Sequence, residues 1–218
     1  MGDFYYALRR NKNSKSLGRR TMHIYVIFAH PSNRSFSRNV LDAFVEGLKD
    51  ASHSYEIADL YQMGFQSEMD EAQYLRETSG DPNLPVPRDV EDEQAKINRA
   101  SGLAFIYPVW WSDCPAKLKG WFDRVLTCGY AYVYDAKGAR GTRMSIEKAL
   151  VLCPAGHTAD HLEETGIADS MRRVMLDDRL LGVGVKQAYM EILGGMMPLD
   201  DSHREQNLRR AYELGKGF

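Results

Sequence analysis

Short apolar runs alternate with amphipathic helical segments along most of this chain. The apolar runs are rich in β-branched and aromatic residues, which is typical of buried strands, and they cover residues 23–28, 55–60, 102–107, 149–153 and 188–193. Helices are predicted at 35–48, 90–100, from 115, at 160–177 and from a capping box at 202–205. Alternating strands and helices form a parallel sheet that is covered on both faces. We therefore predict an α/β fold, with a doubly wound, five-stranded parallel sheet in three layers.

Length and composition agree with one globular domain. The chain has 218 residues, of which 44% are hydrophobic and 27% are charged, and this suits one α/β domain better than two. No apolar run approaches the length of a membrane span, so no membrane insertion is expected. Three cysteines, at 114, 128 and 153, form neither a metal motif nor an even set for disulfides. A reducing, cytoplasmic location fits this pattern best.

The charge of the chain is unevenly distributed. Residues 1–21 carry six Lys or Arg and one acidic residue, Asp3, for a local charge of +5. Because the whole chain has a formal charge of −2, the remainder carries −2 − 5 = −7. We predict a basic N-terminal leader at 1–21 and one domain at 22–218. The leader is either a targeting or surface-binding arm or an extension before a true start at Met22. The acidic body argues against nucleic acid as a main partner.

An aromatic motif follows the third predicted strand. Tyr107-Pro-Val-Trp-Trp111 begins where that strand ends, and the next helix begins at Pro115. Open α/β sheets bind ligands at the carboxyl ends of their strands, and two adjacent tryptophans there are poorly placed for burial alone. The motif predicts a site for a flat aromatic ligand with a phosphate tail, and flavin is the first candidate.

A second binding signal follows the first predicted strand. Hydroxyl groups at Ser32, Ser35 and Ser37 lie where the chain enters a helix. The free N–H groups and the dipole of a helix start favour a phosphate there, although a plain serine N-cap explains the same residues. The chain has no G-x-G-x-x-G after this strand and no Walker A sequence, which argues against a bound NAD core of the Rossmann type.

Taken together, these motifs resemble the NAD(P)H:quinone oxidoreductase family, the flavodoxin_2 group of the flavodoxin-like fold. The matching segments are Phe28-Ala-His-Pro-x3-Ser-Phe-Ser37, Asp59-Leu-Tyr61, Tyr107-Pro-Val-Trp-Trp111 with Pro115-Ala-x-Leu-Lys-Gly-Trp-Phe-Asp-Arg-Val125, and Gly129-Tyr-Ala-Tyr-Val-Tyr134 with residues 135–138. They span about residues 22–205. Five strands also suit a flavodoxin-like order better than a six-stranded Rossmann sheet. The resemblance implies a homodimeric flavoprotein that takes hydride from NAD(P)H and passes two electrons to a quinone-like or other small electrophilic acceptor.

The resemblance also implies which residues contact the flavin. Its phosphate and ribityl end would contact His30, Ser35, Phe36 and Ser37. Its ring system would lie along Pro108, Val109, Trp110 and Trp111, and its N1/O2 edge would border Pro154, Ala155, Gly156 and His157. FMN is preferred to FAD, because the chain shows no distinct adenine-binding segment. The sequence does not choose between NADH and NADPH.

The chain departs from the family at one functional position. A Tyr and a His that are proposed to relay charge in better-known members align here with Leu162 and Ala168. We consider His157 and His161 as catalytic replacements, and two surface histidines beside a helix start are the alternative. Their spacing also invites a metal interpretation, but no third ligand is evident, so no metal is predicted. A flavin-binding electron carrier, or an accessory regulatory subunit without turnover, stays open as an alternative function.

Aromatic residues are dense between 121 and 134. Tyr130, Tyr132 and Tyr134 alternate, so we expect them to share one side of an extended segment. The resemblance implies that this segment lines the acceptor pocket of the neighbouring subunit. Ordinary packing within the chain is the alternative. We place Trp121 and Phe122 in the core or in a dimer surface. The aromatic content of this segment favours a homodimer. Cys114 precedes a helix, a position that lowers a thiol's pKa, but no base accompanies it and we expect it to be non-catalytic.

Overall fold

Five parallel strands form the central sheet of the computed structural model, which describes residues 21–197 and 201–218. They are β1 (His23–Phe28), β2 (Ser54–Asp59), β3 (Gly102–Ile106), β6 (Lys148–Pro154) and β7 (Ala188–Leu193). The order β2-β1-β3-β6-β7 confirms the predicted flavodoxin-like sheet. Apart from residue 21, the predicted leader lies outside the described residues.

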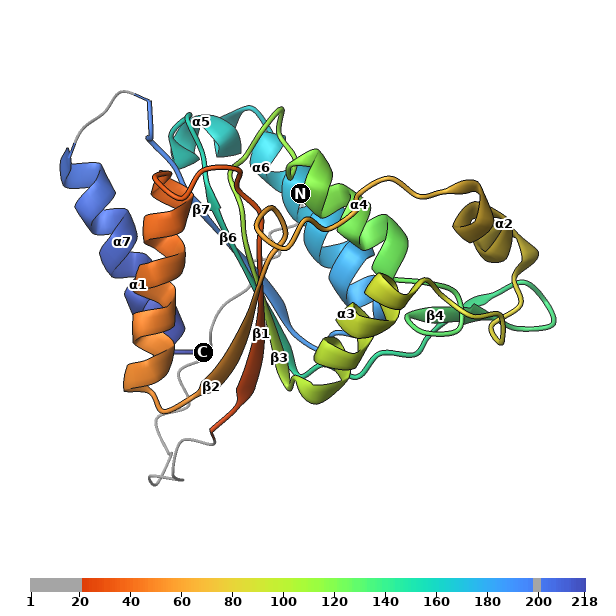
Figure 1. Ribbon diagram of the computed structural model, residues 1–218. Coiled ribbons are helices and arrows are strands. Elements are labelled where there is room, and N and C mark those ends of the chain that lie inside the picture. The colour runs from red at the N-terminus through yellow and green to blue at the C-terminus, as the bar shows by residue number, and fades with distance from the viewer. Residues whose placement is uncertain (1–20, 198–200) are drawn as a thin grey trace, which may run out of the picture.

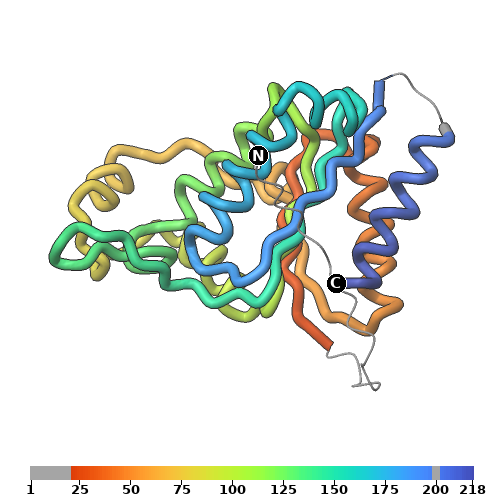
Figure 2. Tube along the Cα trace, turned by 180° about the vertical axis from the view of Figure 1, so that it is seen from behind, coloured from red at the N-terminus to blue at the C-terminus, as the bar shows by residue number. Residues whose placement is uncertain are grey.

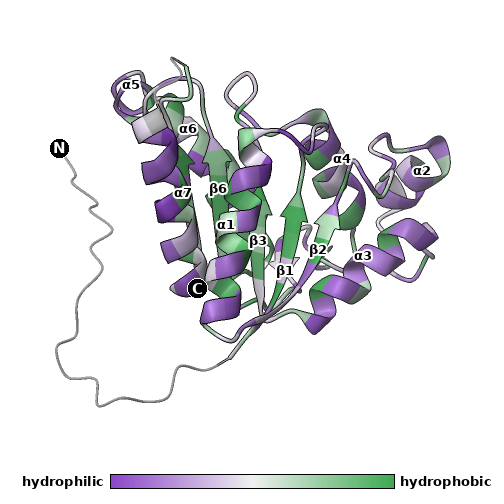
Figure 3. Ribbon diagram, turned by 60° about the vertical axis from the view of Figure 1, so that its left-hand side comes forward, coloured by the Kyte–Doolittle hydropathy of each residue, from purple (hydrophilic) through white to green (hydrophobic). Residues whose placement is uncertain are grey.

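Helices cover both faces of this sheet (Figure 1). One face carries α1 (Phe36–Asp50) and α7 (Asp201–Lys216), and the other carries α3 (Arg88–Arg99), α4 (Ala116–Val125) and α6 (Ile167–Arg172). Side chains of β1 alternate between the two layers, because successive residues of a strand point to opposite faces. Ile24 and Val26 pack in the α1/α7 core, whereas Tyr25 and Ile27 pack with α3 and α4. Figure 3 shows the apolar sheet between helices whose outer surfaces are polar.

Two glycines let α1 and α7 approach closely. A Cβ at Gly47 would lie 2.1 Å from the carbonyl oxygen of Tyr212, and a Cβ at Gly215 would lie 2.1 Å from that of Phe44. Both distances are far below van der Waals contact, so neither position accepts a side chain without a backbone shift. The helix predicted from residue 202 begins at Asp201, so the C-terminal helix is confirmed.

The helix predicted at 160–177 is interrupted. The chain forms α5 (Ala159–Glu164) and then α6, separated by Gly166, whose φ of +73° is left-handed and ends the first helix. After α6 the winding widens into a π-helix, η1 (Arg173–Leu180), followed by a short 3₁₀ turn, η2 (Leu181–Val183). The prediction of one continuous helix was therefore wrong, and a glycine that adopts positive φ is the cause.

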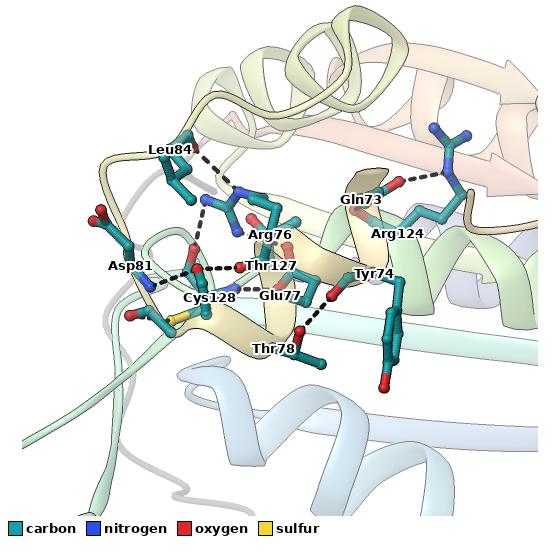
Figure 4. A network of polar contacts seen from close by, with 12 residues as sticks. Gln73, Tyr74, Arg76, Glu77, Thr78, Asp81, Leu84, Arg124, Thr127 and Cys128 are labelled. Atoms are coloured by element: carbon teal, nitrogen blue, oxygen red, sulfur yellow. Dashed lines mark hydrogen bonds and ion pairs between the residues drawn. The ribbon is translucent and has the colours of Figure 1, made fainter. Parts of the chain in front are cut away.

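The long polar connection before α3 contains a helix that was not predicted, α2 (Glu71–Ser79). Its apolar side chains do not form a buried stripe; polar contacts attach it instead (Figure 4). Gln73 exchanges hydrogen bonds with the backbone and side chain of Arg124, while Arg76 donates to the carbonyl oxygens of Leu84 and Cys128. The N-cap Asp70 and the left-handed Gly80 bracket the helix and were its available sequence signals.

A two-stranded antiparallel hairpin, β4 (Tyr132–Tyr134) and β5 (Arg140–Thr142), extends beside α2. Figures 1 and 2 show this hairpin far from α1 and α7. Within the described residues, no helix is both long and apolar enough to cross a bilayer.

Candidate functional site

Three loops at the carboxyl end of the sheet meet in space, as the sequence predicted. The N–H of Ala29, after β1, donates to the carbonyl of Ile106 at 3.1 Å. The N–H of Val109, after β3, donates to the carbonyl of Pro154 at 2.8 Å. The rings of His30 and Trp110 lie 5.8 Å apart between centroids. The predicted phosphate, ring and N1/O2 segments therefore share one edge, at the top of Figure 1.

The loop after β1 enters α1 through a serine cap. Ser35 is extended, and its Oγ accepts a hydrogen bond from the N–H of Arg38 at 3.1 Å, so the side chain forms a standard N-cap. The N–H groups of Phe36 and Ser37, in the first helical turn, have no acceptor within the helix. Together with the helix dipole they favour an anion, so the cap and the phosphate cradle are compatible.

Arg204 of α7 lies beside this cradle and was not predicted. Its guanidinium carbon lies 5.9 Å from the centre of the Phe36 ring. Its Nε is buried and has no hydrogen-bond partner within the described part of the chain. A buried guanidinium nitrogen without a hydrogen-bond partner among the described residues, next to free N–H groups, is suited to bind a phosphate. No sequence pattern indicates this residue, because only the packing of α7 on α1 brings residue 204 to residue 36.

His30 occupies the junction of the first two loops. Its Nδ1 accepts a hydrogen bond from the N–H of Ser32 at 3.0 Å, which assigns the ring proton to Nε2 in the neutral tautomer. Burial lowers the pKa of His30, although the Ser32 contact and the nearby Asp59 oppose this change. The second carboxylate oxygen of Asp59 is buried without a hydrogen-bond partner among the described residues. His30 is therefore a neutral donor at the mouth of the cradle.

A tight turn presents the two tryptophans after β3. Trp110 and Asp113 exchange backbone hydrogen bonds of 3.0 and 3.2 Å, and the central residues Trp111 and Ser112 have φ values of +50° and +63°. Left-handed backbone at non-glycine residues costs about 1–3 kcal/mol each and concentrates at functional sites. Trp110 is 42% exposed and Trp111 is 102% exposed, whereas Pro108 is buried and Val109 is half-buried. Two adjacent exposed indoles at the end of a strand offer an apolar surface that a ligand or a second chain could cover.

The loop after β6 offers backbone donors. Pro154 and Ala155 are buried, and the carbonyls of Gly156 and His157 accept hydrogen bonds from the N–H groups of Met197 and Gly195. The N–H groups of Gly156 and His157 themselves donate to no described residue. Two fixed donors that lack acceptors are suited to stabilise negative charge on a ligand.

The relay positions of the family contain apolar side chains here. Leu162 is 3% exposed and Ala168 is fully buried, and both pack with Ala155. The rings of His157 and His161 lie 4.6 Å apart and both residues are exposed, so they are the titratable side chains nearest to the donor loop. Among the described residues, no group of three or more potential ligands gathers around a metal position.

The tyrosine segment differs from its prediction. Tyr132 and Tyr134 share one side of β4, with ring centroids 5.6 Å apart, and Tyr134 is 58% exposed. Tyr130 instead lies in a turn, and its hydroxyl contacts Gln94 and Asn98 of α3 at 3.2 and 3.1 Å. The expectation that all three share a side was therefore wrong. Within one chain β4 lies away from the loops that carry the other predicted residues (Figure 1).

Three other aromatic or sulfur residues are part of the core. Trp121 is 1% exposed and Phe122 is 5% exposed, which confirms the predicted placement in the core. Their burial removes most of the aromatic surface that had favoured a dimer. Burial also raises the pKa of the Cys114 thiol to about 12, so the expected lowering by the following helix was wrong. A protonated, buried thiol fits a non-catalytic Cys114.

Comparisons with known proteins agree with this architecture. The solved NAD(P)H:quinone oxidoreductase from Methanothermobacter marburgensis is 62% identical, covers 91% of this chain and 96% of its own, and superposes with a TM-score of 0.86. The solved FMN-dependent NADH-azoreductase of Bacillus anthracis, in complex with FMN, is 19% identical, covers 89% and 98% of the two chains, and shows the common fold with a TM-score of 0.69.

Curated relatives are more distant. An uncharacterized NAD(P)H oxidoreductase of Haemophilus influenzae is 26% identical over 87% of this chain and 92% of its own. A ribosyldihydronicotinamide dehydrogenase-like protein of Penicillium crustosum is 29% identical over 71% of this chain, and the match spans 65% of that longer protein. The Flavodoxin_2 model, which describes a flavodoxin-like fold, matches residues 22–214. Because this match covers nearly all of the chain, the protein belongs to the Flavodoxin_2 family.

Proposed function

We propose that this protein is a flavin-dependent NAD(P)H oxidoreductase that passes two electrons through bound FMN to a quinone-like or other small electrophilic acceptor. The observation that carries the proposal is the meeting of three loops at one sheet edge, with His30 against Trp110 and Val109 bonded to Pro154. Each loop supplies a different requirement of a flavin site: anion binding, an aromatic surface and fixed donors. The names of the 62% identical structure and of the Haemophilus relative support the same activity.

The residues present fit FMN. The N–H groups of Phe36 and Ser37 and the buried, unpaired Nε of Arg204 suit the phosphate. The exposed Trp110 and Trp111 suit the flat ring system. The phosphate and the ring system of FMN therefore each have matching groups at this edge.

When bound, FMN supplies the hydride and electron chemistry. The chain itself orients the ring and stabilises charge. The N–H groups of Gly156 and His157, which donate to no described residue, would stabilise negative charge at the N1/O2 edge of the bound flavin. The contact from the N–H of Ser32 to Nδ1 leaves the proton of neutral His30 on Nε2, which would serve as a donor to the cofactor.

The proposal includes a cytoplasmic homodimer in which Tyr132 and Tyr134 line the acceptor pocket of the neighbouring subunit. It is supported by the exposure of Tyr134 and by the position of β4 far from its own loop edge. Sedimentation velocity should give a dimer at micromolar concentration. A monomer that still reduces its acceptor would contradict this part.

The alternative, a flavin-binding carrier or regulatory subunit, makes a different kinetic prediction. If the protein is an enzyme, the purified protein should be yellow, with one flavin per chain, and should oxidise NADH or NADPH with menadione as acceptor. Flavin binding without turnover with either nucleotide would support the alternative. Colourless protein that fails to bind added FMN in a fluorescence titration would refute both.

A double variant tests the location of the site. Ser35→Ala with Trp110→Ala should lose the flavin, because it removes the cap of the cradle and one aromatic contact. Tyr74→Ala with Thr78→Ala is a matched control, since it removes an exposed aromatic and a hydroxyl from α2. The control should keep its full flavin content.

A further inference from the structure

The turn that carries the tryptophans lacks the residues such turns normally need. Two-residue turns with positive φ at both central positions strongly favour Asn-Gly or Gly-Gly, because other residues are strained there. Here the central residues are Trp111 at +50° and Ser112 at +63°. The indole of Trp111 is fully exposed, so packing of that side chain within this chain does not hold the turn. Some other contact must maintain the strained conformation.

That contact is an ion pair at the end of the turn. The two nitrogens Nη1 and Nη2 of Arg179 donate to the two carboxylate oxygens of Asp113 at 2.9 and 3.0 Å. The N–H of Cys114 also donates to Oδ1 of Asp113, at 2.7 Å. A two-bonded arginine–carboxylate pair fixes direction as well as distance, so it restricts the backbone that carries the carboxylate.

The arginine is itself held firmly. Its side chain is only 10% exposed, its guanidinium lies 5.4 Å from the centre of the Phe122 ring, and Nη1 contacts the Cys114 sulfur at 3.6 Å. Arg179 belongs to the π-helix η1. Such wide turns are rare in proteins as a whole, but those that occur are often at functional sites. The wider winding changes the direction of its side chains relative to a continued α-helix.

We propose that Arg179 is a positioning residue: through Asp113 it holds the turn from Trp110 to Asp113 in its left-handed conformation and so keeps Trp110 and Trp111 placed for the flavin. This inference rests on the proposed flavin site. Its physical basis is that a strained turn persists only where its surroundings over-determine it. Within the described part of the chain, no hydrogen bond or ring contact joins Arg179 to either tryptophan, so it acts through Asp113 and the backbone.

The first test measures the turn without any cofactor. In the apoprotein, amide hydrogen exchange followed by NMR reports the two turn hydrogen bonds donated by Trp110 and Asp113. Arg179→Met should raise exchange at both amides about tenfold. Arg173→Met is the matched control, because Arg173 is on the same π-helix, is 73% exposed and pairs with the exposed Asp169. It should leave both amides unchanged.

The second test is rescue by glycine. Ser112→Gly removes the penalty for positive φ at one central position, so in the Arg179→Met background it should restore amide protection and bring the FMN dissociation constant back within about twofold of wild type. Arg179→Met alone should weaken FMN binding about tenfold. If the ion pair merely fastens η1 to α4, glycine will restore neither quantity, and the proposal is refuted.

Two further results keep the test decisive. If Arg179→Met does not fold, Asp113→Asn replaces it, because the half-exposed asparagine side chain keeps the shape of the aspartate and loses its charge. Faster hydrogen exchange at the backbone amides of residues 110 and 113 then supports the proposal, and unchanged exchange overturns it. Wild-type protein that binds no FMN would overturn the proposed function, whereas wild-type binding with unaltered variants would overturn only the role of Arg179.

Discussion

Two polar regions of this molecule are built in opposite ways. Around α2, the buried Arg76 and Arg124 donate to carbonyl groups, carboxylates and an amide, so the network is closed. At the carboxyl edge of the sheet, Asp59 Oδ2 and Arg204 Nε are buried without partners among the described residues, and the N–H groups of Gly156 and His157 find no acceptor there.

This difference distinguishes polar groups that hold elements of the fold together from polar groups that are placed to bind a ligand. Burying a polar group without a hydrogen bond is costly, so a fold that satisfies one network completely does not leave another open without a reason. Closed networks hold elements together, and open ones are completed by a ligand. The four predictions below test this distinction.

The largest effect should come from opening the closed network. Arg124 donates to both carboxylate oxygens of Asp89 and to the carbonyl of Gln66, and it is 4% exposed. Arg124→Met leaves these acceptors unpaired and should lower the free energy of unfolding by about 3 kcal/mol, the low end for a buried pair because Asp89 is partly exposed. Urea denaturation measures it.

The control for this variant is on the same helix. Lys119→Ala removes a pair with Asp123 in which both side chains are nearly half exposed, and it should cost less than about 1 kcal/mol. FMN affinity should be unchanged in folded Arg124→Met. A weakened affinity there would mean that the two regions are not separate.

Removing a positive charge at the carboxyl edge of the sheet should weaken FMN binding and leave folding intact. Arg204→Met should weaken FMN binding by about thirtyfold, which is the value of a hydrogen bond to a charged group. The unfolding midpoint of the apoprotein should change little, since Nε has no hydrogen-bond partner among the described residues. Arg209→Met, an exposed arginine of the same helix, should change neither quantity. Equal affinities for the two variants would exclude Arg204 from the phosphate site.

A smaller effect is expected at the donor loop. Losing one fixed donor to a developing anion costs about 10²–10³ in rate, but backbone donors remain at Gly156 and His157, so His157→Ala should slow flavin reduction by NAD(P)H about tenfold. Flavin binding should be nearly unchanged. Stopped-flow absorbance measures the reduction rate, with His161→Ala as the comparison. Wild-type rates in both variants would leave stabilisation to the backbone alone.

The smallest effect is a pH dependence at Asp113. Burial alone would raise the pKa of this carboxyl, but the hydrogen bonds from Arg179 and from the N–H of Cys114 outweigh it and hold the pKa below its ordinary value of 3.8. The folded pKa is depressed, so the stabilisation is present above pH 3.8 and is lost as the pH falls through the folded pKa. Thermal melts of wild type and Asp113→Asn should therefore converge on acidification. Curves that stay parallel would show that Asp113 does not titrate in this range.

Much of the fold was predictable because its signals are local. All five strands of the central sheet were predicted, since buried parallel strands appear as continuous apolar runs, and Ser35 marked the start of α1; the exposed hairpin of β4 and β5 lacks such a run and was not predicted. The helix α2 was missed because its attachment is polar and has no apolar period. The break at Gly166 was missed because a glycine shows what conformation is allowed and not which one is adopted.

The sequence alone determined the layered α/β fold, a flavodoxin-like order of its strands and the edge shared by the loops after β1 and β3, because strand periodicity and right-handed crossovers leave few alternatives. The loop after β6 was implied by the resemblance to a known family. Tertiary structure alone decided which arginines belong to that edge. Arg204 and Arg179 lie 168 and 66 residues from Phe36 and Asp113, and only the packing of α7 and the widened turn of η1 bring them there. A charged side chain has no sequence period that reveals its partner, so its role depends on which neighbours the fold provides.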